Sequence, residues 1–347
     1  MSTMKAVVFK EHGDRSKLQY TDIPIPEVSA RGVLVRVKAV AMNHLDIWVR
    51  EGWKGLNLQM PHTLGSDIAG IVEKVGAEVT DLKPGTEVLV NPGSSCGVCE
   101  KCLSGADNLC RDYKIIGEHT TGGYAQFVHV QRQNILPKPA KLTFAEAACI
   151  PLTFLTAWSM LVDRAELQPG ETVLVQAGGS GVGSAAIQIA KLMGAKVITT
   201  ASSDEKLQRA KALGADHLIN YKTQDFVAEV KKLTNKKLVD VVFEHVGGET
   251  FEKSIACLPY GGRLVTCGAT AGREVKLDLN VLFYKRISLL GNTMGSKGDL
   301  FRILQLVEEG KLKPVLDRTF PLQDAARAHL FMEERQNIGN LVLLPEA

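Results

Sequence analysis

Four cysteines within fifteen residues carry the strongest chemical signal in this sequence. They are Cys96, Cys99, Cys102 and Cys110, spaced Cys-x2-Cys-x2-Cys-x7-Cys. A tetrahedral zinc ion takes four such thiolates at about 2.3 Å, and a closed set of four leaves no position for a substrate. The spacing therefore predicts one structural Zn²⁺ per chain, in a lobe over about residues 91–112. Free thiols, a redox pair and a four-iron cluster are the alternatives.

A glycine-rich segment at 177–184 is the second chemical signal, because it joins an apolar run to an amphipathic one. Glycines allow a tight turn in which the backbone approaches a pyrophosphate at a helix N-terminus. The standard Gly-x-Gly-x-x-Gly is not met literally, since Ser180 holds one of its three glycine positions. An ordinary tight turn is the alternative. The predicted phosphate-binding residues are Gly178, Gly179, Ser180, Gly181, Val182 and Gly183.

The residues after the next apolar run indicate which dinucleotide binds. An NAD site needs an acidic side chain there for the ribose 2′-hydroxyl. This sequence instead has Ser202 and Ser203, followed by Lys206. Hydroxyl groups and a cation suit a 2′-phosphate, so NADPH is predicted over NADH, with Tyr221 beside the phosphate or the adenine. Asp204 is predicted to cap the next helix, and a solvent-exposed surface lysine is the alternative for Lys206.

The elements that position these residues fall into two kinds. The first 140 residues contain alternating, β-branched runs typical of irregular, barrel-like β structure. From residue 172 on, short apolar runs alternate with helical patterns, which predicts an α/β fold with a doubly wound parallel sheet of six strands. The expected strands are 172–176, 196–200, 217–220, 239–243, 263–267 and 287–291. The expected helices are 143–161, 184–193, 205–213, 225–233 and 250–258. After residue 295 the chain is expected to pack back on its N-terminal part, through helices at 300–309 and 322–333 and a last strand at 339–344.

Composition excludes several classes of protein. The chain has 347 residues with 45% hydrophobic residues and a net charge of +3, so we expect about two domains and neither nucleic acid nor a membrane surface as partner. The sequence contains no run of 18 apolar residues, so we expect no transmembrane helix. No leader is evident, and a cytoplasmic location is therefore expected. Cys149, Cys257 and Cys267 stand alone in apolar runs and are predicted core residues.

Five stretches together resemble the medium-chain dehydrogenase/reductase superfamily of zinc alcohol dehydrogenases and quinone oxidoreductases. They are the four-cysteine lobe and residues 64–70, 181–183, 214–216 and 246–248. The resemblance implies a GroES-like catalytic domain over 1–150, a Rossmann NADP-binding domain over 151–295, and a C-terminal return over 296–347 that completes the first domain. It also implies a homodimer, or a homotetramer, paired through the strand near 287–293.

The sequence departs from this superfamily where zinc alcohol dehydrogenases hold a catalytic zinc. Asn43 stands in the first ligand position, Ser66-Asp67 replaces the His-Glu pair, and the third position falls near Leu152. Because Asn, Ser and Leu cannot form a tight zinc site, the resemblance implies that the catalytic zinc is lost. Without a zinc ion to stabilise it, the negative charge that hydride transfer creates must be delocalised by the acceptor itself. A quinone or an α,β-unsaturated carbonyl does this through its conjugation.

Two alternatives remain at this stage. One is a zinc-type alcohol dehydrogenase or carbonyl reductase whose rearranged metal site uses His62, Glu118 and His119 with His44 and Asp67. The other is a protein that binds NADPH without catalysis.

The resemblance also implies roles for individual residues. Asn43 would donate to the substrate oxygen or the nicotinamide ribose, His44 would reach the pyrophosphate, and Asp46 would organise its loop. Trp48 would line the pocket, and Asp67 would pair with Arg50. The further predicted cofactor contacts are Thr156, Val246, Gly247, Gly268, Ala269, Asn292, Thr293 and Asn340, the last standing where the family has lysine.

Overall fold

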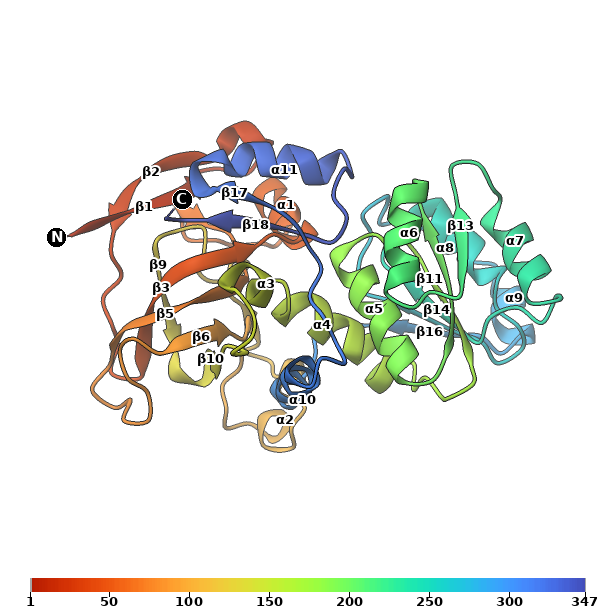
Figure 1. Cartoon of the computed structure of the whole chain (residues 1–347), viewed down its shortest axis with the longest axis horizontal. Coiled ribbons are helices and arrows are strands. Elements are labelled where there is room, and N and C mark those ends of the chain that lie inside the picture. The colour runs from red at the N-terminus through yellow and green to blue at the C-terminus, as the bar shows by residue number, and fades with distance from the viewer. Residues whose placement is uncertain (1, 347) are drawn as a thin grey trace. The chain divides into compact units, whose positions relative to one another are not determined.

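The computed structural model describes residues 2–346 and divides into two compact units (Figure 1). The first unit runs to Leu152 and resumes at Ser296, and we call it the barrel unit. The second, Thr153–Gly295, is a continuous segment that we call the sheet unit.

The barrel unit contains two large, mostly antiparallel sheets and a two-stranded sheet of β7 and β8. The smaller has the order β2-β1-β4, and the larger has the order β10-β6-β5-β3-β18-β17, with β9 also paired to β3. The strands are β1 (Thr3–Phe9), β2 (Gln19–Pro24), β3 (Gly32–Ala41), β4 (His62–Thr63), β5 (Asp67–Val75), β6 (Glu87–Val90), β9 (Phe127–Gln131), β10 (Ile135–Pro137), β17 (Leu316–Pro321) and β18 (Asn340–Leu344). Alternating valines of β3 and apolar residues of β5 form a core in which Val33, Val35 and Ile68 have no solvent exposure.

The C-terminal return enters this larger sheet. Strand β18 lies antiparallel to β3, with Val342 opposite Ala41, and parallel to β17. Figure 1 shows these last strands, in blue, beside the orange β3. The shorter elements of the unit are η1 (Arg15–Lys17), α1 (His44–Glu51), β7 (Gly93–Ser94), α2 (Glu100–Leu103), η2 (Asp107–Leu109), β8 (Lys114–Ile115), η3 (Arg132–Asn134), α3 (Phe144–Ala148), α10 (Lys297–Glu308), η5 (Leu322–Asp324) and α11 (Ala325–Glu333).

The sheet unit contains the predicted six-stranded parallel sheet, which is confirmed with the order β13-β12-β11-β14-β15-β16. Its strands are β11 (Thr172–Val175), β12 (Lys196–Ala201), β13 (His217–Asn220), β14 (Val241–Glu244), β15 (Arg263–Thr266) and β16 (Ser288–Gly291). Its helices are α5 (Gly181–Leu192), α6 (Asp204–Ala212), α7 (Phe226–Leu233), α8 (Gly248–Ile255) and α9 (Leu279–Tyr284). The strand order reverses between β11 and β14, which is where such sheets bind ligands, at the carboxyl ends of their strands.

The helix expected over 143–161 is interrupted. Helix α3 ends at Ala148, α4 (Pro151–Trp158) begins at a proline, and a π-helical segment (Ser159–Arg164) follows. Proline is favoured at the first position of a helix but removes a hydrogen bond from its interior, which explains the break. Although no run of 18 uninterrupted apolar residues exists, the stretch Phe144–Arg164 is long and apolar enough to cross a membrane. However, 78% of its most apolar window is buried inside the protein, as in a core helix.

Candidate functional site

The four predicted zinc ligands converge in the barrel unit. The Sγ–Sγ distances are 3.5 Å for Cys99–Cys102, 3.6 Å for Cys96–Cys110, and 3.8 Å for both Cys96–Cys102 and Cys99–Cys110. A tetrahedron with Zn–S bonds of about 2.3 Å has edges of roughly 3.8 Å. The four thiols therefore fit a structural zinc, and they are the one group of this kind among residues 2–346.

Local structure and one distant helix hold this zinc lobe in place. Cys99 precedes α2, Cys102 lies in it, and Cys110 follows η2. From the start of α10, the Lys297 backbone donates to Asp107 Oδ1 at 2.9 Å, and its ammonium donates to Ser95 Oγ at 3.2 Å. The C-terminal return thus braces the lobe from outside.

Two of the three positions that lack zinc ligands, Asn43 and Leu152, donate hydrogen bonds to one carboxylate, that of Asp67. Asn43 Nδ2 donates to Asp67 Oδ2 at 2.9 Å, and the Leu152 backbone donates to Asp67 Oδ1 at 2.8 Å. Ser66, which precedes Asp67 in the chain, has a buried hydroxyl with no hydrogen-bond partner among the described residues. Asp67 is fully buried, and this burial raises its pKa to about 7. A side-chain amide and a backbone N–H thus hold a carboxyl group that can bind a proton, and of Asn43, Ser66 and Asp67 only Asp67 is a usual zinc ligand.

The residues proposed for a rearranged metal site make other contacts in the structure. His62 Nε2 bonds the Gly117 carbonyl at 3.1 Å, and His119 Nδ1 accepts from the Ile115 backbone at 3.1 Å. Glu118 lies 3.6 Å from His119, and its burial raises its pKa to about 7. No second group of three or more potential metal ligands occurs in the part of the chain described here, residues 2–346.

The raised pKa of Asp67 predicts a pH dependence of stability. Its pKa rises from 3.8 unfolded to about 7 folded, so its contribution is complete below pH 4 and is lost as the pH rises towards 7. For about three pKa units, the upper limit is about 4 kcal/mol. We expect Asp67→Asn to abolish this loss, which melting temperatures between pH 4 and 8 would measure. Replacement of the exposed Asp22 by asparagine is the control, and parallel profiles for Asp67→Asn and wild type would contradict the prediction.

The prediction that Asp67 forms an ion pair with Arg50 is wrong. Arg50 is 1% exposed and donates instead to Glu333 at 2.8 Å and Glu51 at 3.1 Å. Glu333 lies in α11, so no local sequence pattern could identify it as the partner.

The other predicted residues of this region lie on or near α1. Burial and the nearby Arg335 lower the pKa of His44 to about 4, so at neutral pH it would meet a phosphate as a neutral hydrogen-bond donor. Trp48 is partly buried, with its ring centroid 6.2 Å from that of His44. Asn340 is buried and donates to the Cys149 carbonyl at 3.0 Å, so its amide nitrogen already has a partner within the barrel unit.

The glycine-rich turn of the sheet unit has the close packing that a dinucleotide loop needs. Ser180 caps α5 and accepts from the Gly183 backbone at 3.0 Å. A Cβ on Gly178 would lie 2.1 Å from Thr199 Oγ1, and one on Gly183 would lie 2.5 Å from the Ala177 carbonyl oxygen. Since neither position has room for a side chain, strand, turn and helix approach as closely as in nucleotide-binding βα units.

The residues after β12 reach this turn. A Cβ on Gly179 would lie 3.1 Å from Lys206 Cβ and Cδ, which places the lysine stem against the glycine loop. Ser203, not Asp204, caps α6, because its hydroxyl accepts from the Lys206 backbone at 3.4 Å. The prediction for Asp204 is wrong, since its carboxylate accepts from Asn220 Nδ2 at 3.0 Å. Ser202 is partly buried, and Tyr221 is 37% exposed.

The remaining predicted cofactor contacts follow the carboxyl ends of neighbouring strands. Val246 and Gly247 follow β14, Gly268 and Ala269 follow β15, and Asn292 and Thr293 follow β16; Thr156 is buried in α4. The Asn292 side chain accepts from Ser159 Oγ at 2.9 Å and donates to the Met294 carbonyl at 2.9 Å.

Sequence reasoning missed Glu244 and His245, which organise this edge of the sheet. The buried Glu244 carboxylate accepts from Val246 N at 2.8 Å and Gly247 N at 3.1 Å. Burial raises its pKa. His245 Nε2 lies 3.0 Å from the Gln176 carbonyl oxygen. The signal in the sequence that could have identified Glu244 is an acidic residue at the end of an apolar strand.

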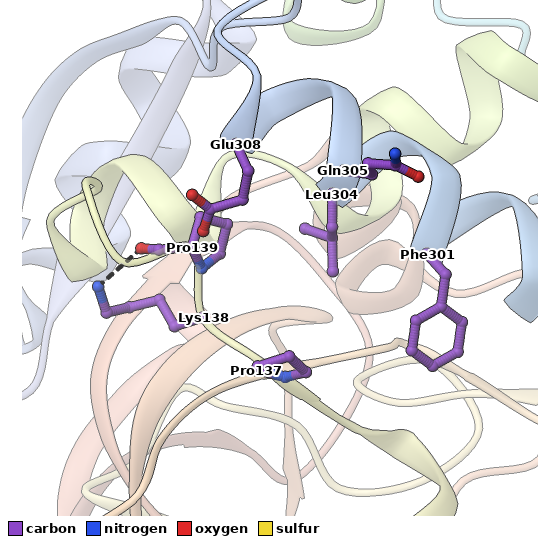
Figure 2. Close-up of a pocket in the computed structure, with 7 residues that line it drawn as sticks. All are labelled: Pro137, Lys138, Pro139, Phe301, Leu304, Gln305 and Glu308. Atoms are coloured by element: carbon purple, nitrogen blue, oxygen red, sulfur yellow. Dashed lines mark hydrogen bonds between the residues drawn. The ribbon is translucent and has the colours of Figure 1, made fainter.

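A separate pocket of about 230 Å³ in the barrel unit contains none of these residues (Figure 2). It lies between the end of β10 and α10. Its lining residues are Pro137, Lys138, Pro139, Phe301, Leu304, Gln305 and Glu308.

Comparisons with known proteins agree with the two-unit architecture. Residues 29–140 match the model of the alcohol dehydrogenase GroES-like domain, and residues 181–309 match that of the zinc-binding dehydrogenases. An NAD-dependent alcohol dehydrogenase of Sulfurisphaera tokodaii is 34% identical, over 99% of this chain and all of that protein.

The chain belongs to the medium-chain dehydrogenase/reductase superfamily. Within this superfamily, a quinone oxidoreductase of Pseudomonas aeruginosa is 32% identical, over 98% of this chain and 99% of that protein. The crystal structure of an NAD-dependent alcohol dehydrogenase is 51% identical, with a TM-score of 0.95, over 98% of this chain and 99% of that chain. The protein is therefore an oxidoreductase of the medium-chain kind with a site for structural zinc.

Proposed function

We propose that this protein is an NADPH-dependent reductase that transfers hydride to a quinone or an activated C=C bond of a small molecule, without a catalytic zinc. The observation that carries the proposal is the donor set around Asp67. By the resemblance, Asn43, Ser66 and a position near Leu152 correspond to the catalytic zinc ligands of alcohol dehydrogenases, and here the Asn43 amide and the Leu152 backbone donate to Asp67. This set suits hydrogen bonding and proton binding and does not suit a tight zinc site.

Residues of this centre match the demands of such a reduction. Bound NADPH would supply the hydride, which leaves negative charge on the acceptor oxygen and calls for a hydrogen-bond donor and a proton. Asn43 Nδ2 uses one of its two N–H groups on Asp67, so the other is available to a substrate oxygen. A carboxyl group with a pKa of about 7 is suited to give a proton at neutral pH. Trp48 and Asp46 would shape and order the site.

The preference for NADPH rests on the end of β12. Ser202, Ser203 and Lys206 offer hydroxyl groups and a cation to a 2′-phosphate. Asp204, the nearest acid, bonds Asn220. His44, Thr156, Asn340, Tyr221, the glycine loop and the residues after β14, β15 and β16 complete the proposed cofactor site.

We also propose that the chain forms a cytoplasmic homodimer through β16. This strand is an edge of its sheet, so its outer hydrogen-bonding groups remain available to a second copy. Large apolar side chains near it are exposed, among them Phe283, Tyr284 and Tyr260, at 66%, 69% and 65%.

One experiment on a purified sample tests the function. Zinc content and oligomeric mass are measured, and then enones, quinones, enoyl thioesters, aldehydes and alcohols are assayed with both nicotinamide cofactors. We expect one zinc per chain, a dimeric mass, and NADPH-driven reduction of enones or quinones. Two zincs per chain with alcohol oxidation as the main activity would support the rearranged metal site instead. Tight NADPH binding with no turnover would indicate a non-catalytic protein.

A further inference from the structure

A chain of buried polar side chains leads away from the Asn43–Asp67 centre through the barrel unit. Asp46 and Arg50 lie one turn apart on α1, Tyr124 precedes β9, and His329 lies on α11. Each is at most 1% exposed. The proposed reaction uses none of Tyr124, His329 and Arg50 directly, yet a buried polar group is costly unless it is hydrogen-bonded.

The hydrogen bonds of this chain have a fixed direction. Arg50 Nη1 lies 3.0 Å from His329 Nδ1, and a guanidinium can only donate, so Nδ1 accepts. Burial and the neighbouring Arg50 and His44 lower the pKa of His329 to about 3, so its ring is neutral and carries its hydrogen on Nε2. Nε2 then donates to the Tyr124 oxygen at 3.3 Å, and the Tyr124 hydroxyl donates to Asp46 Oδ2 at 3.2 Å.

At the inner end of the chain, Asp46 joins the two segments of the site. Its Oδ2 also accepts from the Asn43 backbone at 2.9 Å, and its Oδ1 accepts from the Gly65 backbone at 3.1 Å. Three donors favour a carboxylate over a carboxylic acid. Burial raises the pKa of Asp46 to about 6, so the carboxylate still predominates at neutral pH.

We propose that Tyr124, His329 and Arg50 are positioning residues that hold Asp46 as a carboxylate and, through it, fix Asn43 and Asp67 in their reactive arrangement. The inference rests on the proposed role of the Asn43–Asp67 pair. The chain is not a route for protons to solvent, because its outer member, Arg50, does not give up a proton at accessible pH. It acts on Asp67 by geometry and by charge.

The charge effect has a definite sign. The groups that face Asp67 are the Asn43 amide, the Leu152 backbone, the Asp46 carboxylate and the Cys149 thiol. Negative charge on Asp46 disfavours ionisation of Asp67. Loss of a donor to Asp46 favours its protonated form, which removes that charge and lets Asp67 ionise at lower pH.

Replacement of Tyr124 by phenylalanine is the sharpest test, because it removes one hydroxyl and keeps the ring. We expect kcat to fall about tenfold with little change in KM, and the high-pH limb of the kcat/KM profile to move down by roughly half a pH unit or more. His329→Leu should behave alike. His329→Gln should restore both quantities, since its amide can accept from Arg50 and donate to Tyr124. Val88→Ala, in the same core, is the control for lost stability alone.

A second measurement does not depend on activity. The ¹³C carboxyl resonance of Asp67, assigned by its absence in Asp67→Asn, should titrate at lower pH in Tyr124→Phe than in wild type. An unchanged titration, or a His329→Gln protein that behaves like His329→Leu, would overturn the inference. If no quinone or enone is reduced, the proposed function fails, while the titration still decides whether the chain controls Asp67.

Discussion

A Cys110→Ser protein is expected to lose its zinc and to melt roughly 10 °C or more below wild type, because a structural zinc contributes directly to folding free energy. Cys110 is 6% exposed, and its Sγ lies 3.6 Å from Cys96 and 3.8 Å from Cys99. Serine offers a poor zinc ligand, so three thiolates would remain around the ion. Apart from the contacts with α10, the lobe has little apolar core of its own, since Val98, Leu103 and Leu109 are 76%, 76% and 62% exposed.

Zinc content by elemental analysis and a thermal melt of the same sample measure this effect. Cys257→Ser is the matched control, because Cys257 is a buried cysteine of the sheet unit outside the cluster. We expect the control to retain one zinc per chain. A Cys110→Ser protein with full zinc content and an unchanged melting temperature would show that the cluster is not a structural zinc site.

Lys206→Ala is expected to lower kcat/KM for NADPH by about 10- to 100-fold while leaving NADH nearly unchanged. A hydrogen bond to a charged group contributes about 1.5–3 kcal/mol, and the 2′-phosphate exists only on NADPH. The expectation follows from the position of the Lys206 stem against Gly179. This position puts the Lys206 ammonium near the glycine-rich turn, where the proposed cofactor would bind.

Steady-state kinetics with both cofactors measure this change. Lys211→Ala is the matched control, because Lys211 is an exposed lysine in the same helix beyond the loop. An equal loss with NADPH and NADH, or a wild-type protein that prefers NADH, would count against the proposed cofactor preference.

Features encoded by short-range spacing were predictable from the sequence. The cysteine cluster lies within one loop, and the six strands of the sheet unit begin and end within about two residues of the expected positions, because buried parallel strands are apolar throughout. Helix α9 was not predicted because its apolar residues do not form one buried face with helical spacing. Leu279 and Phe283, for example, are 65% and 66% exposed.

Partners far apart in the chain were not predictable. Arg50 pairs with Glu333, which follows it by 283 residues, and His329 reaches Tyr124 across 205. No local pattern records such contacts, since they depend on how the C-terminal return packs against α1. The same holds for Asp67, whose high pKa arises from burial that only the folded chain produces.

The pairing of β3 with β18 also constrains how the polypeptide acquires its structure during translation. The sheet unit is continuous, so all of its strands are available once Gly295 has left the ribosome. In the larger sheet of the barrel unit, Ala41 at the end of β3 cannot pair with β18 until Val342 has also been made, 47 residues after Gly295. Until then the last residues of β3 present one unpaired, apolar edge, while β5 and β9 cover the rest of the strand, and an unpaired strand edge is a site for aggregation. The nascent chain therefore carries an unprotected strand edge in an early segment while the whole sheet unit is being made.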